Sequence, residues 1–294
     1  MRSTGHDAAA LAPGTHEFAV DGVRQVYHVA GTGPVCVAHS GGPGIEWAYL
    51  RTPSLEEHFT MVYVEPVGTG ASGRLARRDD YRLDTYVRFL HAVVEHLGVA
   101  SVHLLGHSHG GFVVQRYALD HPDRVAGLAL YDTSPVTGAE FWAEAMAGLA
   151  AYPGRHPDRP EAAAVPAAFE RAVTATDDDT LSAALGAAIP VYFADFWARR
   201  DELAPIQAAV RAWAEPASAQ DPTPFDVRDR LGEIVAPTVV IVGAHDFICG
   251  VRWADQLHEG IKGSHLVVLA DSGHFGHVEQ PAEFTAAVRE LLRA

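Results

Sequence analysis

The pentapeptide GHSHG, residues 106–110, constrains the fold of this chain more than any other feature. It follows the apolar run 102–105 and precedes a segment with helical periodicity, which we expect to begin at Gly110. Glycines on both sides of Ser108 permit a sharp turn, since they carry no Cβ that could clash. The pattern therefore predicts a strand–turn–helix unit that exposes the Ser108 hydroxyl at the tip of a strand.

Short apolar runs alternate with helical patterns on both sides of this turn, as an α/β fold requires. We expect strands at 35–38, 61–64, 102–105, 125–131, 238–242 and 265–269, and helices at 83–97, from Gly110, around 253–257 and at 281–292. Continuous apolar strands suit a sheet that is covered on both faces. The prediction is an α/β fold with a mostly parallel central sheet flanked by helices, and with residues 1–18 as a loose tail.

The composition changes near Ser134. From there to about residue 231 the chain is rich in alanine and helical in pattern, and no convincing strand interrupts it. A length of 294 residues fits either two domains or one domain with an insertion. Because the α/β rhythm resumes afterwards, we interpret residues 1–133 and 232–294 as one core and 134–231 as a helical cap.

Charge and apolar content exclude several classes of partner. The chain has 22 basic and 37 acidic residues, and Lys262 is its single lysine. A net charge of −15 repels phosphate backbones and anionic lipid, so we expect neither nucleic acid nor membrane as a partner. No apolar run approaches the roughly 20 residues of a membrane span. Cys36 and Cys249 form no CxxC pair, so free thiols and a cytoplasmic location are expected.

A serine is a weak nucleophile at its ordinary pKa and needs a base. The best candidate is His274, which follows the last expected strand and stands next to Gly273. His277 is the nearest alternative, and it is expected to begin the turn into the final helix. We therefore predict Ser108 as nucleophile and His274 as base.

The base needs a carboxylate that fixes its tautomer. Asp246 directly follows the expected strand 238–242 in the segment GAHDFI, and it gives the chain order Ser108, Asp246, His274. Asp132 also follows a strand and stays open as the alternative acid. Asp271 is interpreted as a loop carboxylate.

Acyl transfer also needs two N–H donors for the oxyanion. One should be the backbone N–H of His109, directly after the nucleophile. The other should come from the loop HSGGPG, residues 39–44, with Gly42 as the best candidate. A phosphate-binding loop is the alternative for these glycines, but the lysine of that motif is missing. The predicted chemistry needs no metal and no cofactor.

These motifs together resemble the α/β-hydrolases, and among them the group similar to proline iminopeptidases. The shared marks are GGPG at 41–44, the turn around Ser108, the Asp246 loop and Gly273-His274. The resemblance covers nearly the whole chain and implies a Ser-His-Asp hydrolase with a helical cap. The chain departs from the group at Ser40, where histidine is usual, and at His109, where tryptophan is usual. The loop at 65–68 also reads EPVG rather than the usual DQRG type.

Those departures affect the specificity and not the triad, so we favour an esterase or lactonase for small, largely apolar molecules. A proline iminopeptidase-type aminopeptidase or amidase is the alternative, and a non-catalytic ligand receptor is a third. The insertion carries aromatic side chains that we predict to bind substrate: Trp142, Tyr192, Phe193, Phe196 and Trp197. Asp195, Asp201 and Glu202 are the candidates for binding an amine. The expected partner is a small-molecule substrate, and the expected assembly is a monomer or homodimer.

Overall fold

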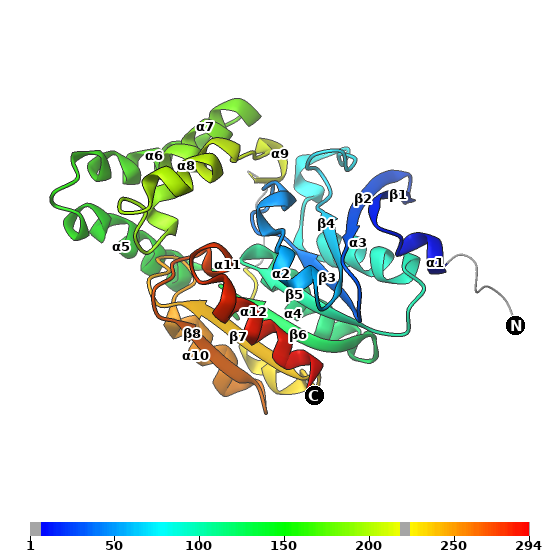
Figure 1. Cartoon of the computed structure of the whole chain (residues 1–294). Coiled ribbons are helices and arrows are strands. Elements are labelled where there is room, and N and C mark those ends of the chain that lie inside the picture. The colour runs from blue at the N-terminus through cyan, green and yellow to red at the C-terminus, as the bar shows by residue number, and fades with distance from the viewer. Residues whose placement is uncertain (1–6, 218–223, 294) are drawn as a thin grey trace, which may run out of the picture.

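The computed structural model describes residues 7–217 and 224–293. Its centre is one eight-stranded sheet in the order β1-β2-β4-β3-β5-β6-β7-β8 (Figure 1). The strands are β1 (Gly14–Val20), β2 (Val23–Ala30), β3 (Val35–His39), β4 (Thr60–Glu65), β5 (Val102–His107), β6 (Val125–Tyr131), β7 (Thr238–Gly243) and β8 (His265–Leu269). β2 is antiparallel to β1 and β4, and the remaining neighbours are parallel. The predicted fold class is confirmed.

The N-terminal hairpin corrects one expectation. Residues 14–18 were expected to belong to a loose tail, but they form most of β1, which pairs with β2 from Gly14↔Val29 to Val20↔Val23. The Tyr27 ring is fully buried, and its hydroxyl donates to the carbonyl of Ala10 at 2.9 Å. This anchoring holds the segment on the sheet. Residues 1–6 lie outside the described part of the chain.

Helices cover both faces of the sheet. They are α1 (Asp7–Ala10), α2 (Pro53–Glu56), α3 (Leu83–His96), α4 (His109–Asp120), α10 (Val251–Gly260), α11 (Gly276–Glu279) and α12 (Pro281–Arg289). Leu104 faces the apolar cluster that contains α3, α4 and α10, whereas Leu105 faces the one that contains α2 and α12. Alternation along the strand sends neighbouring side chains to opposite faces. Burial on both sides explains why the strand sequences are continuously apolar.

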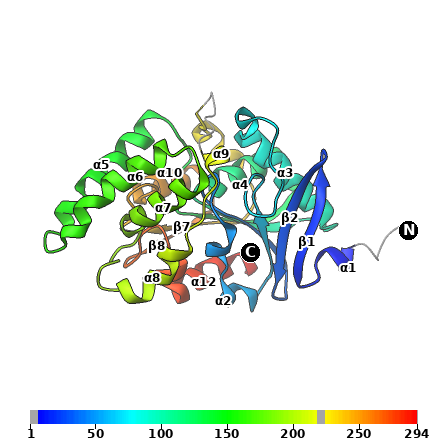
Figure 2. The same ribbon diagram turned by 90° about the horizontal axis from the view of Figure 1, so that it is seen from above.

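Among the described residues, five helices lie between β6 and β7, at one side of the sheet (Figures 1 and 2). They are α5 (Ala139–Arg155), α6 (Val165–Thr174), α7 (Asp178–Ala188), α8 (Arg200–Ala209) and α9 (Ala214–Ala217). Short 3₁₀ turns complete the chain: η1 (Trp47–Leu50), η2 (Arg78–Asp80), η3 (Pro122–Arg124), η4 (Pro160–Ala164), η5 (Ile189–Tyr192), η6 (Arg228–Glu233) and η7 (Glu290–Leu292). We call the segment 134–231 the cap, and its exact boundaries stay a prediction.

Two isolated antiparallel bridges involve the cap, one within it and one to another segment. Val136 pairs with Asp226 where the chain enters and leaves the cap. Ile45 pairs with Ala212, and the N–H of Trp213 donates to the carbonyl of Gly44 at 2.8 Å. The second bridge ties the cap to the glycine loop 39–44 and its continuation.

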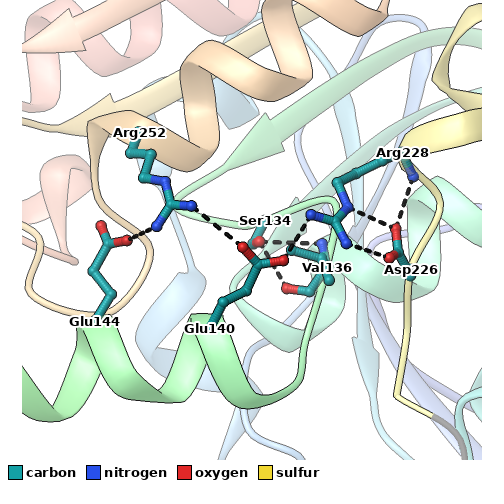
Figure 3. Close-up of polar contacts among 7 residues, drawn as sticks. All are labelled: Ser134, Val136, Glu140, Glu144, Asp226, Arg228 and Arg252. Atoms are coloured by element: carbon teal, nitrogen blue, oxygen red, sulfur yellow. Dashed lines mark hydrogen bonds and ion pairs between the residues drawn. The ribbon is translucent and has the colours of Figure 1, made fainter.

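An exposed ion-pair network lies at the base of the cap (Figure 3). Arg252 of α10 pairs with Glu144 at 2.6 Å and with Glu140 at 3.3 Å, both on α5. Arg228 pairs with Glu140 at 2.6 Å and with Asp226 at 2.5 Å. Each exposed pair contributes at most about 1 kcal/mol, so the network orients α5 more than it stabilises the fold.

Among the described helices, none combines the length and the apolar character that crossing a membrane requires.

Candidate active site

Ser108 occupies a strained turn between β5 and α4. Its φ of 53° and ψ of −121° lie in a region that non-glycine residues rarely adopt, at a cost of about 1–3 kcal/mol. The backbone N–H of Ser108 donates to the carbonyl of Tyr131 at 3.0 Å, which helps to hold the turn. A side chain at Gly110 would collide with the backbone of His39, so glycine is required where α4 packs on β3. The side chain of Ser108 is partly exposed.

Asp246 and His274 form a buried pair. The Oδ2 atom of Asp246 lies 2.7 Å from Nδ1 of His274, and the two side chains are 0% and 4% exposed. An ionised carboxylate only accepts hydrogen bonds, so Nδ1 carries the proton and Nε2 keeps its lone pair. The Oδ1 atom accepts the N–H groups of Ile248 at 2.9 Å and Cys249 at 3.2 Å, which fixes the carboxylate.

Cys249 lies against this pair. Its sulfur lies within 4.8 Å of ligand atoms of Asp246 and His274. Burial, and then the charge of Asp246, raise the pKa of the Cys249 thiol well above its usual value. The structure thus places the Cys249 thiol beside the Asp246–His274 pair, and Ser108 lies on the turn that follows β5.

Asp132, the alternative acid, lies close to the same histidine but is bound differently. Its Oδ1 atom accepts the N–H of Gly243 at 2.8 Å, and Oδ2 has no partner among the described residues. Complete burial, followed by the charge of Asp246, raises the pKa of Asp132 well above its usual value. The hydrogen bond of Asp246 to His274, together with the two N–H groups that hold its other oxygen, favours Asp246 as the triad acid.

The glycine loop 39–44 lies against Ser108. A methyl group on Gly41 would stand 3.0 Å from the Ser108 Cβ, and the N–H of Gly41 donates to the Tyr49 hydroxyl at 2.7 Å. Gly42 is exposed with a φ of 129°, and its peptide bond to Pro43 is cis. His109 is the first residue of α4, so its N–H has no partner within the helix. These positions suit the predicted donors, Gly42 and His109.

A directed chain of hydrogen bonds connects this loop to His274. The Nε2 atom of His107 lies 2.9 Å from the carbonyl of His274 and must donate, since a carbonyl only accepts. The Nδ1 atom then accepts from the Tyr49 hydroxyl at 2.6 Å. Burial lowers the pKa of His107 well below its usual value, which keeps the ring neutral as the chain requires. Tyr49 and His107 are therefore positioning residues.

We expect Tyr49→Phe to lower kcat about tenfold with a smaller change in KM. The substitution removes the acceptor of the Gly41 N–H and the hydroxyl that donates to His107 Nδ1. A tenfold loss corresponds to about 1.4 kcal/mol at the transition state. Steady-state kinetics with a good ester substrate measures this. Tyr27→Phe is the control, because it removes a buried tyrosine hydroxyl far from Ser108. An equal loss of kcat in both variants would contradict the positioning role.

The predicted cap residues occupy different surroundings. The Tyr192 ring lies 5.5 Å from the His274 ring, and its carbonyl accepts the N–H of His274 at 2.6 Å. Phe193 and Phe196 are buried in one apolar cluster, and Trp197 packs against it. Trp142 is 46% exposed on α5. The structure brings Tyr192 to His274, and it places the Phe193 ring 5.1 Å from the ring of Phe275, the next residue.

Glu279 ties the His274 loop to the cap. Its carboxylate accepts the N–H of Gly273 at 2.7 Å and the N–H of Ala194 at 2.8 Å. Burial raises the pKa of Glu279 to about 6. Asp246 therefore holds the ring of His274, and Glu279 holds the backbone of the preceding residue, Gly273.

Comparison with known proteins gives the family. A family model described as "alpha/beta hydrolase fold" matches residues 33–281. The chain belongs to the α/β-hydrolase fold family. This α/β-hydrolase is similar to a 2-hydroxy-6-oxo-2,4-heptadienoate hydrolase of Pseudomonas putida. The two sequences are 27% identical over 277 residues, and the alignment covers 93% of this chain and 94% of the relative.

Solved α/β-hydrolase structures have the same architecture. A hydrolase from Pseudomonas aeruginosa PA01 superposes with a TM-score of 0.71 and 25% identity, over 96% of this chain and all of the other. An enol-lactonase from Burkholderia xenovorans LB400 gives a TM-score of 0.72 at 21% identity, over 95% of this chain and all of the other, and that likeness shows the fold alone.

Sequence reasoning missed four residues of this site: Tyr49, His107, Cys249 and Glu279. His107 and Cys249 had a signal, since one lies inside the pentapeptide and the other three residues after Asp246. Tyr49 and Glu279 stand outside every motif, and only the fold brings them to the loops that they hold.

Proposed function

We propose that this α/β-hydrolase cleaves a carboxylic ester or lactone of a small, largely apolar molecule through an acyl-enzyme on Ser108. The observation that carries the proposal is the buried 2.7 Å pair of Asp246 and His274 beside a serine held on a strained turn. The turn holds the hydroxyl in position before substrate binds, so little conformational entropy of the serine is lost in the reaction.

The chemistry follows from the tautomer of His274. Its Nε2 takes the proton of Ser108 as the oxygen attacks the carbonyl carbon, and Asp246 stabilises the imidazolium that results. The N–H groups of His109 and Gly42 donate to the oxyanion. His274 returns the proton to the leaving oxygen, and then activates a water molecule that releases the acid. None of these steps calls for a cofactor.

The surroundings of the nucleophile favour an uncharged substrate. The His109 ring lies 5.0 Å from the Tyr86 ring and 6.0 Å from the Phe112 ring. Burial lowers the pKa of His109 to about 3 and that of His39 to about 4, so both rings are neutral near pH 7. Neutral imidazoles and aromatic faces suit an ester or lactone better than a carboxylate.

A second candidate reaction comes from the curated relatives. A 2-hydroxy-6-oxo-2,4-dienoate contains no ester or amide, so its hydrolysis must break the C–C bond beside the 6-oxo group. The same triad could carry out that reaction. The carboxylate of such a substrate needs a cationic partner, and the neutral rings of His39 and His109 provide none.

The aminopeptidase alternative needs a carboxylate that is free to bind an ammonium group. Glu202 pairs with Arg199 at 2.5 Å, and Asp195 accepts the N–H of Ala198 at 3.1 Å. Asp201 is exposed on α8. Two of the three candidates are thus already engaged, which weighs against an amine substrate.

A side-by-side rate assay tests the proposal. It compares a short nitrophenyl ester, a panel of lactones, a 2-hydroxy-6-oxo-dienoate and a proline nitroanilide, with Ser108→Ala as the blank. We expect an ester or lactone to turn over at least about 100-fold faster than the anilide, because two of the three candidate carboxylates for an ammonium group are already engaged. If the dienoate is hydrolysed faster than every ester and lactone, the protein is a C–C hydrolase and the proposal is wrong. Faster anilide turnover would make the protein an aminopeptidase.

A further inference from the structure

A second set of donor atoms overlaps the catalytic pair. Cys249, Asp246 and His274 each offer a ligand atom, and the three atoms lie within 4.8 Å of one another. All three residues are buried, with exposures of 1%, 8% and 3%. In a tetrahedral zinc site with bonds of about 2.0–2.3 Å, ligand atoms lie roughly 3.3–3.8 Å apart. Oδ2 of Asp246 and Nδ1 of His274 are 2.7 Å apart, so an ion bound by both residues replaces their hydrogen bond, and the three side chains need only small shifts to reach the zinc spacing.

We propose that Cys249, His274 and Asp246 form a binding site for Zn²⁺, and that its occupation stops catalysis. A thiolate, an imidazole and a carboxylate are the ligands that Zn²⁺ prefers in proteins. A thiolate and a carboxylate also balance the double charge of the ion, which a buried position requires.

Binding proceeds with a defined proton balance. Zn²⁺ forms a bond to the Cys249 sulfur, and the proton of the thiol leaves to solvent. No electron is transferred. Three protein ligands leave the fourth position of a tetrahedral ion open. Ser108, the proposed nucleophile, is partly exposed.

Occupation of the site blocks the proposed reaction directly. The ion competes for the same Asp246 carboxylate and the same imidazole that the base mechanism needs. A coordinated His274 cannot accept the proton of Ser108. Inhibition rests on the proposed serine hydrolase function, whereas binding of the ion does not, so the two are measured separately.

The binding experiment is calorimetry of Zn²⁺ with Ser108→Ala and with the double variant Ser108→Ala/Cys249→Ala, in a buffer that binds no metal. We expect one strong site in the first protein that is at least tenfold weaker or lost in the second. Co²⁺ gives an independent readout, since a thiolate-to-cobalt charge-transfer band should appear only while Cys249 is present. Equal affinities in both proteins, or no charge-transfer band, overturn the proposal.

The activity experiment measures ester hydrolysis against Zn²⁺ concentration, each protein being compared with its own metal-free rate. We expect inhibition of the wild-type protein that EDTA reverses, and at least tenfold weaker inhibition of Cys249→Ala. Cys36→Ala is the matched control, because Cys36 is a buried free thiol on β3. Cys249→Ser keeps the size of the side chain and should behave like Cys249→Ala. If Zn²⁺ inhibits Cys249→Ala as strongly as the wild-type protein, the site is refuted. If the protein binds Zn²⁺ but hydrolyses no ester or lactone, only the proposed reaction is refuted.

Discussion

Replacing Ser108 with alanine should lower kcat by about 10⁵- to 10⁶-fold, as removal of a triad nucleophile does in other serine hydrolases. The remaining rate would come from the oxyanion donors and from substrate binding. Alanine has to adopt the same backbone conformation, with φ near 53°, so the free energy of unfolding should change by less than about 1 kcal/mol. Single-turnover kinetics and chemical denaturation measure the two effects.

Ser54→Ala is the control for this substitution. The Ser54 hydroxyl is bonded to Thr285 at 2.6 Å, between α2 and α12, and it takes no part in the site. Its kcat should match that of the wild-type protein. A Ser108→Ala variant that keeps more than about 1% of the rate would show that the nucleophile is another group.

The second large effect concerns the triad acid. We expect Asp246→Asn to lower kcat by about 10⁴-fold, because an amide NH₂ group at the Oδ2 position cannot accept the proton of His274 Nδ1. The amide oxygen can still accept the N–H groups of Ile248 and Cys249, so the turn should persist. The histidine then adopts the wrong tautomer inside an intact fold.

Asp132→Asn is the matched control, since it changes a neighbouring buried carboxyl in the same way. The asparagine oxygen keeps the bond to the N–H of Gly243, and its NH₂ group takes the place of a protonated oxygen. We expect kcat to fall less than tenfold. The opposite order of effects, measured with the same ester, would falsify the assignment of Asp246 and make Asp132 the triad acid.

Much of the core could be predicted because local signals there agree with the fold. Each strand expected from 35–38 onward is present, and all but β8 are largely buried on both faces, which gives continuous apolar runs. Helix α4 begins at His109, one residue before the expected Gly110. The hairpin β1–β2 was missed because Gly14–Phe18 has little apolar character, with most of its residues exposed or half-buried.

The candidate site divides in the same way. Ser108, Asp246 and His274 could be predicted because each follows a strand, and parallel strands bring their ends to one edge of the sheet. The surroundings of the cap aromatics could not be predicted, because a helical pattern does not say which side faces the nucleophile. Phe196 and Trp142 show this, one buried within the cap and the other 46% exposed.

The bridge between Ile45 and Ala212 couples the cap to the loop that carries Gly42, the predicted oxyanion donor. The segment that carries Gly42 continues directly into this bridge, where the N–H of Glu46 also donates to the carbonyl of Arg211 at 3.0 Å. The position of the cap at 211–213 and the position of the glycine loop therefore depend on each other. A substitution that loosens the cap at this point should disturb the predicted catalytic loop as well.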